Sequence, residues 1–207
     1  MTGAQVIVKM LEKYRVEYIF GVPGDTSIKL YEALYDNQSN IRHIMARDER
    51  SASFMADAYA RLSHKPGFCE CPSGAGSLYT VPGVAEANAS SIPVIAITSD
   101  VPLAGEGKQT ITELDTQQLY ESITKWASVV KGVDKIPEVI RRAFRIATTG
   151  RPGAVHIAFP KETLYDDFLK DSKDLYADES CCTYPAYRTR GARIELEALV
   201  SYIIGAD

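Results

Sequence analysis

The stretch Ile41-Arg42-His43-Ile44-Met45-Ala46-Arg47-Asp48-Glu49 joins a short apolar strand, residues 41–46, to the start of a helix. The helix is indicated by small and apolar residues that recur at helical spacing, namely Ala52, Met55, Ala56, Tyr59 and Ala60. A carboxylate at such a junction can reach the carboxyl edge of a parallel sheet, where open α/β folds bind ligands. The helix dipole alone also favours an acidic residue in a first turn. The position of Glu49 therefore leaves two interpretations open, a ligand-binding group and a helix-start carboxylate.

The same strand-then-helix unit recurs along most of the chain. Further strands are expected at residues 18–20, 68–71, 93–98, 127–131 and 154–159. Helices are expected at 2–14, where Thr2 and Gln5 fit a capping box, at 26–35 with Thr26 as the cap, and at 75–90, 115–121 and 137–150. Short strands that alternate with helices are typical of a parallel sheet covered on both faces. The predicted fold class is α/β, a three-layer α/β/α domain with a mainly parallel sheet.

The periodic pattern ends at residue 165, which sets the predicted domain organisation. Residues 1–165 are predicted to form one domain, and residues 166–190, which show no period, are predicted to be a linker. A helical stripe follows, made of Leu196, Leu199, Val200, Ile203 and Ile204. A lone amphipathic helix has little to pack against, so residues 191–207 are predicted to be the start of a second, truncated domain.

The composition narrows the function classes. With 45% hydrophobic and 24% charged residues, the chain is expected to fold as a soluble globular protein. The net charge of −4 and the absence of a basic cluster argue against a nucleic-acid partner. There is no apolar run of 18 residues and no signal-peptide pattern, so no membrane partner is expected and the predicted location is cytoplasmic. The spacings of Cys69-Glu70-Cys71 and Cys181-Cys182 favour buried structural thiols over a zinc site.

Several motifs in fixed order resemble a known family. These are Gly21-Val22-Pro23-Gly24-Asp25, Arg47-Asp48-Glu49, Ser73-Gly74-Ala75-Gly76 and Ser91-Ile92-Pro93-Val94, followed by Glu113-Leu114-Asp115, Ile123-Thr124-Lys125-Trp126 and Thr149-Gly150-Arg151-Pro152-Gly153. Together they resemble the amino-terminal pyrimidine-binding domain of thiamine diphosphate enzymes of the acetolactate synthase and pyruvate decarboxylase group. The order and spacing of the motifs carry the resemblance, which covers about residues 2–165.

The resemblance implies a catalytic role for Glu49, whose carboxylate would hydrogen-bond a pyrimidine nitrogen and so help the thiazolium carbon to lose its proton. Asp25 and Thr112 are further catalytic candidates. Asp25 matches an acidic position of the decarboxylase branch but could equally be a helix cap, and Thr112 lies where acetolactate synthases usually have Gln. Cofactor contacts are implied for Val22, Pro23, Gly24, Glu49, Ser73, Gly74, Ala75 and Tyr79. His43, His64 and His156 match no catalytic histidine of the family.

The implied cofactors are thiamine diphosphate and Mg²⁺. The family binds the diphosphate and Mg²⁺ in a separate domain marked by Gly-Asp-Gly, which this sequence lacks, so no metal-binding residue is expected in this chain. The resemblance also implies a 2-oxo acid substrate in the full enzyme, decarboxylase or carboligase activity, a homodimer or homotetramer, and an inactive isolated chain. Departures from the glycine-loop pattern at Pro72, Ala75 and Tyr79 leave the particular reaction open, and the use of FAD is open too.

Two alternatives remain open at this stage. The chain could be a pyrimidine-binding small subunit that pairs with a separate diphosphate-binding chain. It could also be a non-catalytic nucleotide-binding regulatory module, because a sheet of this kind supports many functions.

Overall fold

The computed structural model describes residues 1–36, 39–170 and 172–205, and its centre is a six-stranded sheet. The strands are β1 (Tyr18–Gly21), β2 (Arg42–Met45), β3 (Gly67–Pro72), β4 (Val94–Asp100), β5 (Trp126–Val129) and β6 (Val155–Pro160). Their order is β2-β1-β3-β4-β6-β5, and every neighbouring pair is parallel. All carboxyl ends of the strands therefore meet at one edge of the sheet.

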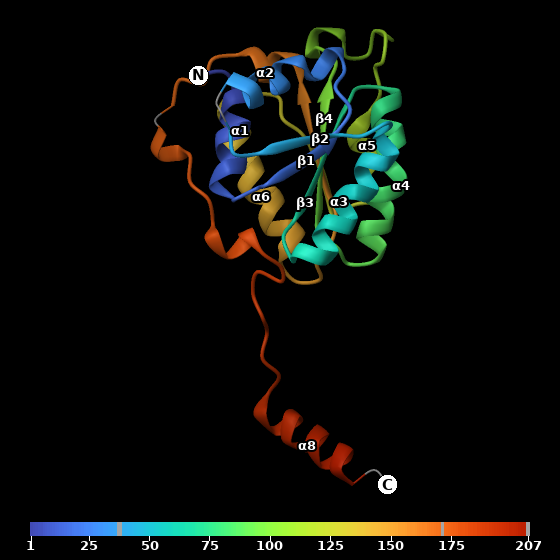
Figure 1. Ribbon diagram of the computed structural model, residues 1–207, viewed down its shortest axis with the longest axis vertical. Helices are drawn as coiled ribbons and strands as arrows, with labels where there is room; N and C mark the ends of the chain where they lie inside the picture. Colours follow the sequence, from blue (N-terminus) through green and yellow to red (C-terminus); the bar gives the residue numbers. More distant parts are fainter. Residues whose placement is uncertain (37–38, 171, 206–207) are drawn as a thin grey trace.

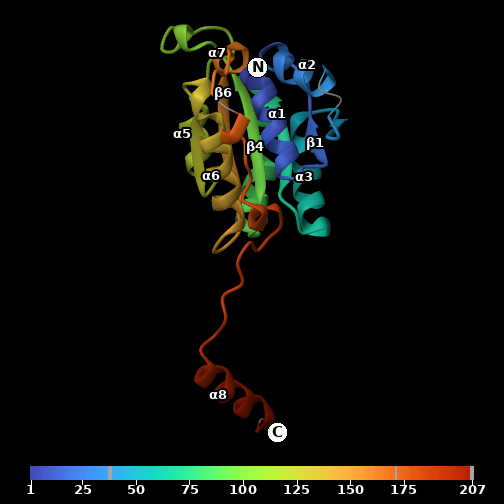
Figure 2. The ribbon, with the colours of Figure 1, turned by 90° about the vertical axis from the view of Figure 1, so that its left-hand side faces the viewer.

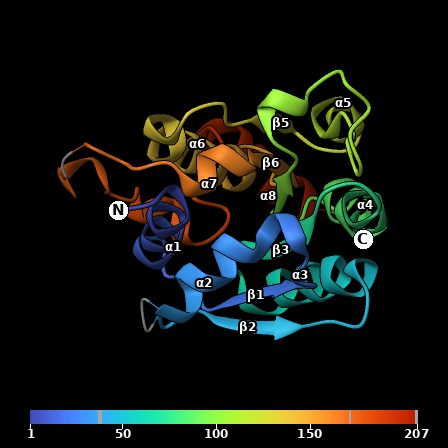
Figure 3. The ribbon, with the colours of Figure 1, turned by 90° about the horizontal axis from the view of Figure 1, so that it is seen from above.

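Helices cover both faces of this sheet (Figure 3). On one side lie α1 (Gly3–Lys13) and α6 (Ile136–Thr148), with α2 (Ile28–Asp36) packed against α1. On the other side lie α3 (Glu49–Ser63), α4 (Ala75–Ala89) and α5 (Thr116–Glu121). The short α7 (Lys161–Tyr165) follows β6. The predicted three-layer α/β/α fold with a parallel sheet is confirmed.

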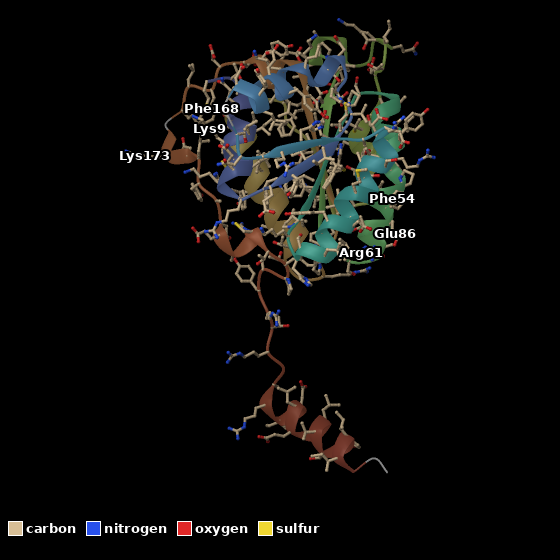
Figure 4. The ribbon with its side chains drawn as sticks, in the orientation of Figure 1. Lys9, Phe54, Arg61, Glu86, Phe168 and Lys173 are labelled. Atoms are coloured by element: carbon tan, nitrogen blue, oxygen red, sulfur yellow. The ribbon has the colours of Figure 1, made fainter. Side chains whose placement is uncertain are left out.

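The two faces of the sheet are packed differently. Under α1 and α6 the core contains large side chains, and the rings of Tyr14 and Phe144 stack with centroids 3.6 Å apart. Under α3 and α4 small residues such as Ala56 and Ala87 dominate, which lets these two helices approach each other closely. On their outer side Arg61 joins them, pairing with Asp57 of α3 at 2.9 Å and Glu86 of α4 at 3.3 Å (Figure 4). The position of α3 matters because Glu49 is its first residue.

The predicted helix starts have different outcomes. The capping box of α1 is confirmed, since Gln5 N–H donates to Thr2 Oγ1 and Thr2 N–H donates to Gln5 Oε1. The prediction that Thr26 caps the next helix is wrong. A 3₁₀ turn, η1 (Asp25–Ser27), precedes α2, and buried Thr26 instead accepts a hydrogen bond from Ser73 N–H at 3.1 Å.

Part of the segment predicted as a linker packs against the domain. Phe168, Leu175, Cys181 and Cys182 are buried in the same core as α1 and α6. The predicted terminal helix is present as α8 (Arg193–Ile204), which has no buried residue and lies apart from the sheet (Figures 1 and 2). Within the part of the chain that is described, no helix has both the length and the apolar character needed to cross a membrane.

Candidate functional site

The strand order changes direction between β1 and β3. After β1 the chain adds β2 on one side, and then returns to add β3 on the other side of β1. The helices that follow β1 and β2 accordingly lie toward opposite faces, as α2 and α3 do in Figure 3. Ligands of open α/β sheets bind at such a switch point, outside the carboxyl ends of the strands. Residues 22–24 follow β1 and residues 73–76 follow β3, and both segments are predicted to contact a cofactor.

The turn after β1 packs directly against the end of β3. A Cβ atom added to Gly24 would lie 2.5 Å from Cβ of Pro72, so only glycine fits between the two segments. Ser27 closes the turn, because its Oγ accepts a hydrogen bond from Gly24 N–H at 3.0 Å. Val22 and Gly24 are half-buried and Pro23 is exposed. The turn therefore presents its backbone at the sheet edge, and its Gly24 end is fixed by contacts with Pro72 and Ser27.

Glu49 is a half-buried residue in the first turn of α3. The cap of this helix is Asp48, whose side chain accepts a hydrogen bond from Ser51 N–H at 2.8 Å, and this bond lowers the pKa of Asp48. Glu49 is therefore not needed as the cap, although the helix dipole still acts on it. Its Oε1 atom lies 3.1 Å from the point where a Cβ of Gly76 would be. The carboxylate thus lies beside the loop that follows β3.

The loop after β3 is shaped by glycine and hydrogen-bonded to Thr112. Gly74 has φ of +69°, a left-handed conformation that side chains rarely adopt. Buried Ser73 shares a hydrogen bond with Thr112, with 2.7 Å between their hydroxyl oxygens. A Cβ on Gly74 would lie 2.8 Å from Thr112 Cβ. The structure therefore brings Thr112 against the glycine loop.

The remaining predicted residues are less closely joined to this group. The Asp25 side chain is 86% exposed, and its ion pair with Lys161 spans 4.0 Å. Ala75 and Tyr79 are exposed on the first turns of α4. The switch point thus gathers the turn after β1, Glu49, Ser73, Gly74 and Thr112, while Asp25, Ala75 and Tyr79 lie on the surface around it. The catalytic and cofactor-binding roles of all these residues stay predictions.

A fully buried carboxyl, which the sequence interpretation missed, lies beneath the turn after β1. Glu70 is fully buried on β3. The Tyr31 hydroxyl donates to its Oε2, Ser99 Oγ donates to its Oε1 at 3.4 Å, and Ser27 also hydrogen-bonds it. Burial raises the pKa of Glu70 to about 8, these hydroxyls oppose the shift, and the nearby Glu49 charge adds to it. The signal in the sequence was a single acidic residue inside the apolar run 68–71.

This raised pKa predicts a pH-dependent stability. Between pH 4.5 and about 8 the unfolded chain has lost the Glu70 proton and the native chain has kept it, so raising the pH favours unfolding. Relative to Glu70→Gln, the wild-type free energy of unfolding should fall by about 1.4 kcal/mol per pH unit across this window, and level off above it. Urea denaturation of both proteins at pH 5, 6, 7 and 8 measures the difference. A difference that stays constant over this range would contradict the prediction.

A cleft lies elsewhere on the same edge of the sheet. It has a volume of about 660 Å³ and is lined by residues 100–103, 106–107 and 113–118, together with Glu121, Val129, Lys131 and Pro160. None of the predicted site residues lines it. In the described part of the chain, no group of three His, Cys, Asp or Glu side chains is placed to hold a metal ion.

Comparison with known proteins decides the family. Residues 1–119 match the family described as "Thiamine pyrophosphate enzyme, N-terminal TPP binding domain". The chain belongs to this family. The matched region of this thiamine pyrophosphate-binding domain contains β1 to β4, Glu49, the glycine loop and Thr112.

Relatives of this domain include acetolactate synthases. It is 46% identical to the "Probable acetolactate synthase large subunit" of Methanocaldococcus jannaschii, over 78% of this chain and 27% of that protein. It is 36% identical to "Acetolactate synthase isozyme 1 large subunit" of Escherichia coli, over 93% of this chain and 34% of that protein. For "Acetolactate synthase, chloroplastic" of Arabidopsis thaliana the identity is 40%, over 77% and 24%. The chain thus spans about a quarter to a third of the length of these relatives.

Proposed function

We propose that this domain supplies the pyrimidine half of the cofactor site in an acetolactate synthase-like decarboxylase or carboligase that acts on a 2-oxo acid. The observation that carries the proposal is the convergence of the turn after β1, Glu49 and the glycine loop at the switch point of the sheet. The relatives named above support the same class of reaction.

The residues present fit an aminopyrimidine ring. Glu49 offers a half-buried carboxylate, the turn at 22–24 offers backbone groups, and Gly74 and Gly76 keep the facing loop free of side chains. When bound, thiamine diphosphate supplies a thiazolium carbon that adds to a 2-oxo acid. Glu49 would hydrogen-bond the ring nitrogen and stabilise a proton there. Ser73 and Thr112 would fix the loop beside the ring.

Other parts of the active site are proposed to lie outside these residues. Thiamine enzymes of this group bind the diphosphate through Mg²⁺ in a domain marked by Gly-Asp-Gly, and this sequence has no such motif. We therefore propose that Glu49 faces a second subunit in a homodimer or homotetramer, and that this subunit supplies the Mg²⁺ and diphosphate site. Closed dimers are the commonest assemblies of soluble proteins. The proposed compartment is the cytoplasm.

The isolated 207-residue chain is expected to turn over no pyruvate and to bind thiamine diphosphate weakly, because it contributes only the pyrimidine contacts. Acetolactate and acetaldehyde would be assayed with the cofactor and Mg²⁺ present, with the complete enzyme as the positive control. Thermal-shift titrations with thiamine diphosphate, FAD and adenine nucleotides would compare the ligands. Turnover by the chain alone would contradict the proposed division of the active site. A complete enzyme whose activity does not depend on thiamine diphosphate would overturn the proposed function.

A further inference from the structure

Glu70 is chemically unexpected where it stands. Its strand, β3, lies between β1 and β4, and the residue is completely shielded from solvent. Carboxyl groups are almost never fully buried unless they are paired, because desolvation is costly and an apolar residue of similar size would avoid this cost. Three hydroxyl groups, from Ser27, Tyr31 and Ser99, hydrogen-bond this carboxyl. The desolvation cost of Glu70 and its hydrogen bonds together suggest that this carboxyl has a specific function.

The contacts of Glu70 hold both ends of the turn after β1. At the first end, a Cβ on Gly21 would lie 2.9 Å from the Tyr31 hydroxyl and 3.2 Å from Glu70 Oε2, so this pair packs on the Gly21 backbone. At the second end, Ser27 hydrogen-bonds both Glu70 and Gly24. These are two independent contacts with residues on either side of Val22 and Pro23.

The same carboxyl also links the turn to neighbouring elements. Tyr31 belongs to α2, and its hydroxyl lies 3.1 Å from Nε2 of His43 on β2. Ser99 lies near the end of β4. Glu70 therefore joins α2 and the carboxyl ends of β1 and β4 directly, and β2 through Tyr31.

We propose that Glu70 is a positioning residue, which holds the turn at residues 22–24 in the shape that receives the pyrimidine. The cofactor part of this proposal rests on the function proposed above. The protonation of Glu70 supports it. With its pKa near 8, Glu70 is mainly neutral at pH 7, so it can hold the turn without adding a second negative charge close to Glu49.

Two substitutions separate the hydrogen bonds of Glu70 from its size. Glu70→Leu removes the hydrogen bonds, whereas Glu70→Gln keeps a neutral hydrogen-bonding group of the same length. Exchange of the Gly24 amide hydrogen, followed by NMR in the 207-residue chain, should be about tenfold faster in Glu70→Leu, the effect expected from the loss of one net hydrogen bond. In Glu70→Gln it should stay close to the wild-type rate.

The matched control is Thr148→Val, which removes a buried hydrogen bond of 2.8 Å to Phe144 at the far end of α6 and should leave Gly24 unchanged. If Glu70→Leu does not fold, Tyr31→Phe removes the hydroxyl that donates to Glu70 Oε2 and leaves the Ser27–Gly24 hydrogen bond in place, and it should also speed exchange at Gly24. Exchange at Gly24 that is unaltered in both variants overturns the proposal.

The cofactor part is measured in the complete enzyme. In Glu70→Leu the thiamine diphosphate concentration for half-maximal turnover should rise about tenfold with little change in kcat, the pattern of lost uniform binding, and Glu70→Gln should restore it. Faster exchange at Gly24 with unchanged cofactor affinity would overturn the cofactor part. A wild-type enzyme that shows no saturation by thiamine diphosphate would overturn the proposed function, and exchange at Gly24 would still decide whether Glu70 holds the turn.

Discussion

Replacing Glu49 by Gln in the complete enzyme is expected to lower turnover about 10²- to 10⁴-fold, the usual contribution of a general acid or base. Gln keeps the length and a hydrogen-bonding group but lacks the negative charge that would stabilise a proton on the pyrimidine. Exchange of the thiazolium proton, followed by NMR after acid quench, should slow in parallel with turnover. Circular dichroism and thermal unfolding should be unchanged, because Asp48 remains as the cap of α3.

A matched substitution separates chemistry from the helix dipole. Glu138 is an exposed acidic residue in the first turn of α6, so Glu138→Gln removes the same charge from the first turn of a helix outside the proposed site. It should leave turnover and proton exchange at wild-type values. If Glu49→Gln exchanges the thiazolium proton as fast as wild type, Glu49 is only a helix-start carboxylate and the catalytic assignment fails.

The second large effect is expected for Gly83→Val, where α4 crosses α3. A Cβ on Gly83 would lie 2.3 Å from Ser53 Oγ and 2.7 Å from both Phe54 N and Ser53 C. The serine side chain could rotate, but the backbone atoms cannot move without shifting α3. Overpacking of this kind lies at the upper end of the usual range, so we expect the free energy of unfolding to fall by about 3 kcal/mol. For a chain of this size the melting temperature should drop by roughly 6 to 12 °C.

Ala58→Val is the control for this prediction, because Ala58 is an exposed position in the middle of α3. It carries the small loss of helix propensity that valine brings, about half a kcal/mol. Urea denaturation of the two variants and the wild type measures the difference. Equal stabilities for Gly83→Val and Ala58→Val would show that the two helices can separate freely, contrary to the packing described here.

The parallel sheet was predictable because its signals are local. Each strand is a short apolar run, and the helices repeat apolar residues at helical spacing. The start of α1 could also be predicted, because Thr2 and Gln5 form a capping box. The family motifs placed Glu49 and the two loops at one edge. Thr26 was misassigned because an N-cap and a buried loop threonine have the same local sequence, and only the fold brings Ser73 N–H to its hydroxyl.

Glu70 shows what local patterns could not supply. The run 68–71 indicates a strand whether or not its acidic residue has a partner. Those partners come from residues 27, 31 and 99, far away in the sequence, and only the order of the strands brings them together. The packing of Phe168, Leu175, Cys181 and Cys182 against the domain is a similar case, because these apolar residues show no period.

The four cysteines can report the opening of two different parts of the molecule. All are free and buried, and burial raises the pKa of each thiol, so a thiol reagent can react only when the surrounding structure opens. Cys181 and Cys182 belong to a 3₁₀ turn, η5 (Glu179–Cys182), that packs on α6, whereas Cys69 and Cys71 lie within the sheet beside Glu70. The rate at which Cys181 and Cys182 are labelled would report how often η5 detaches from α6. The rate at which Cys69 and Cys71 are labelled would report how often the sheet itself opens.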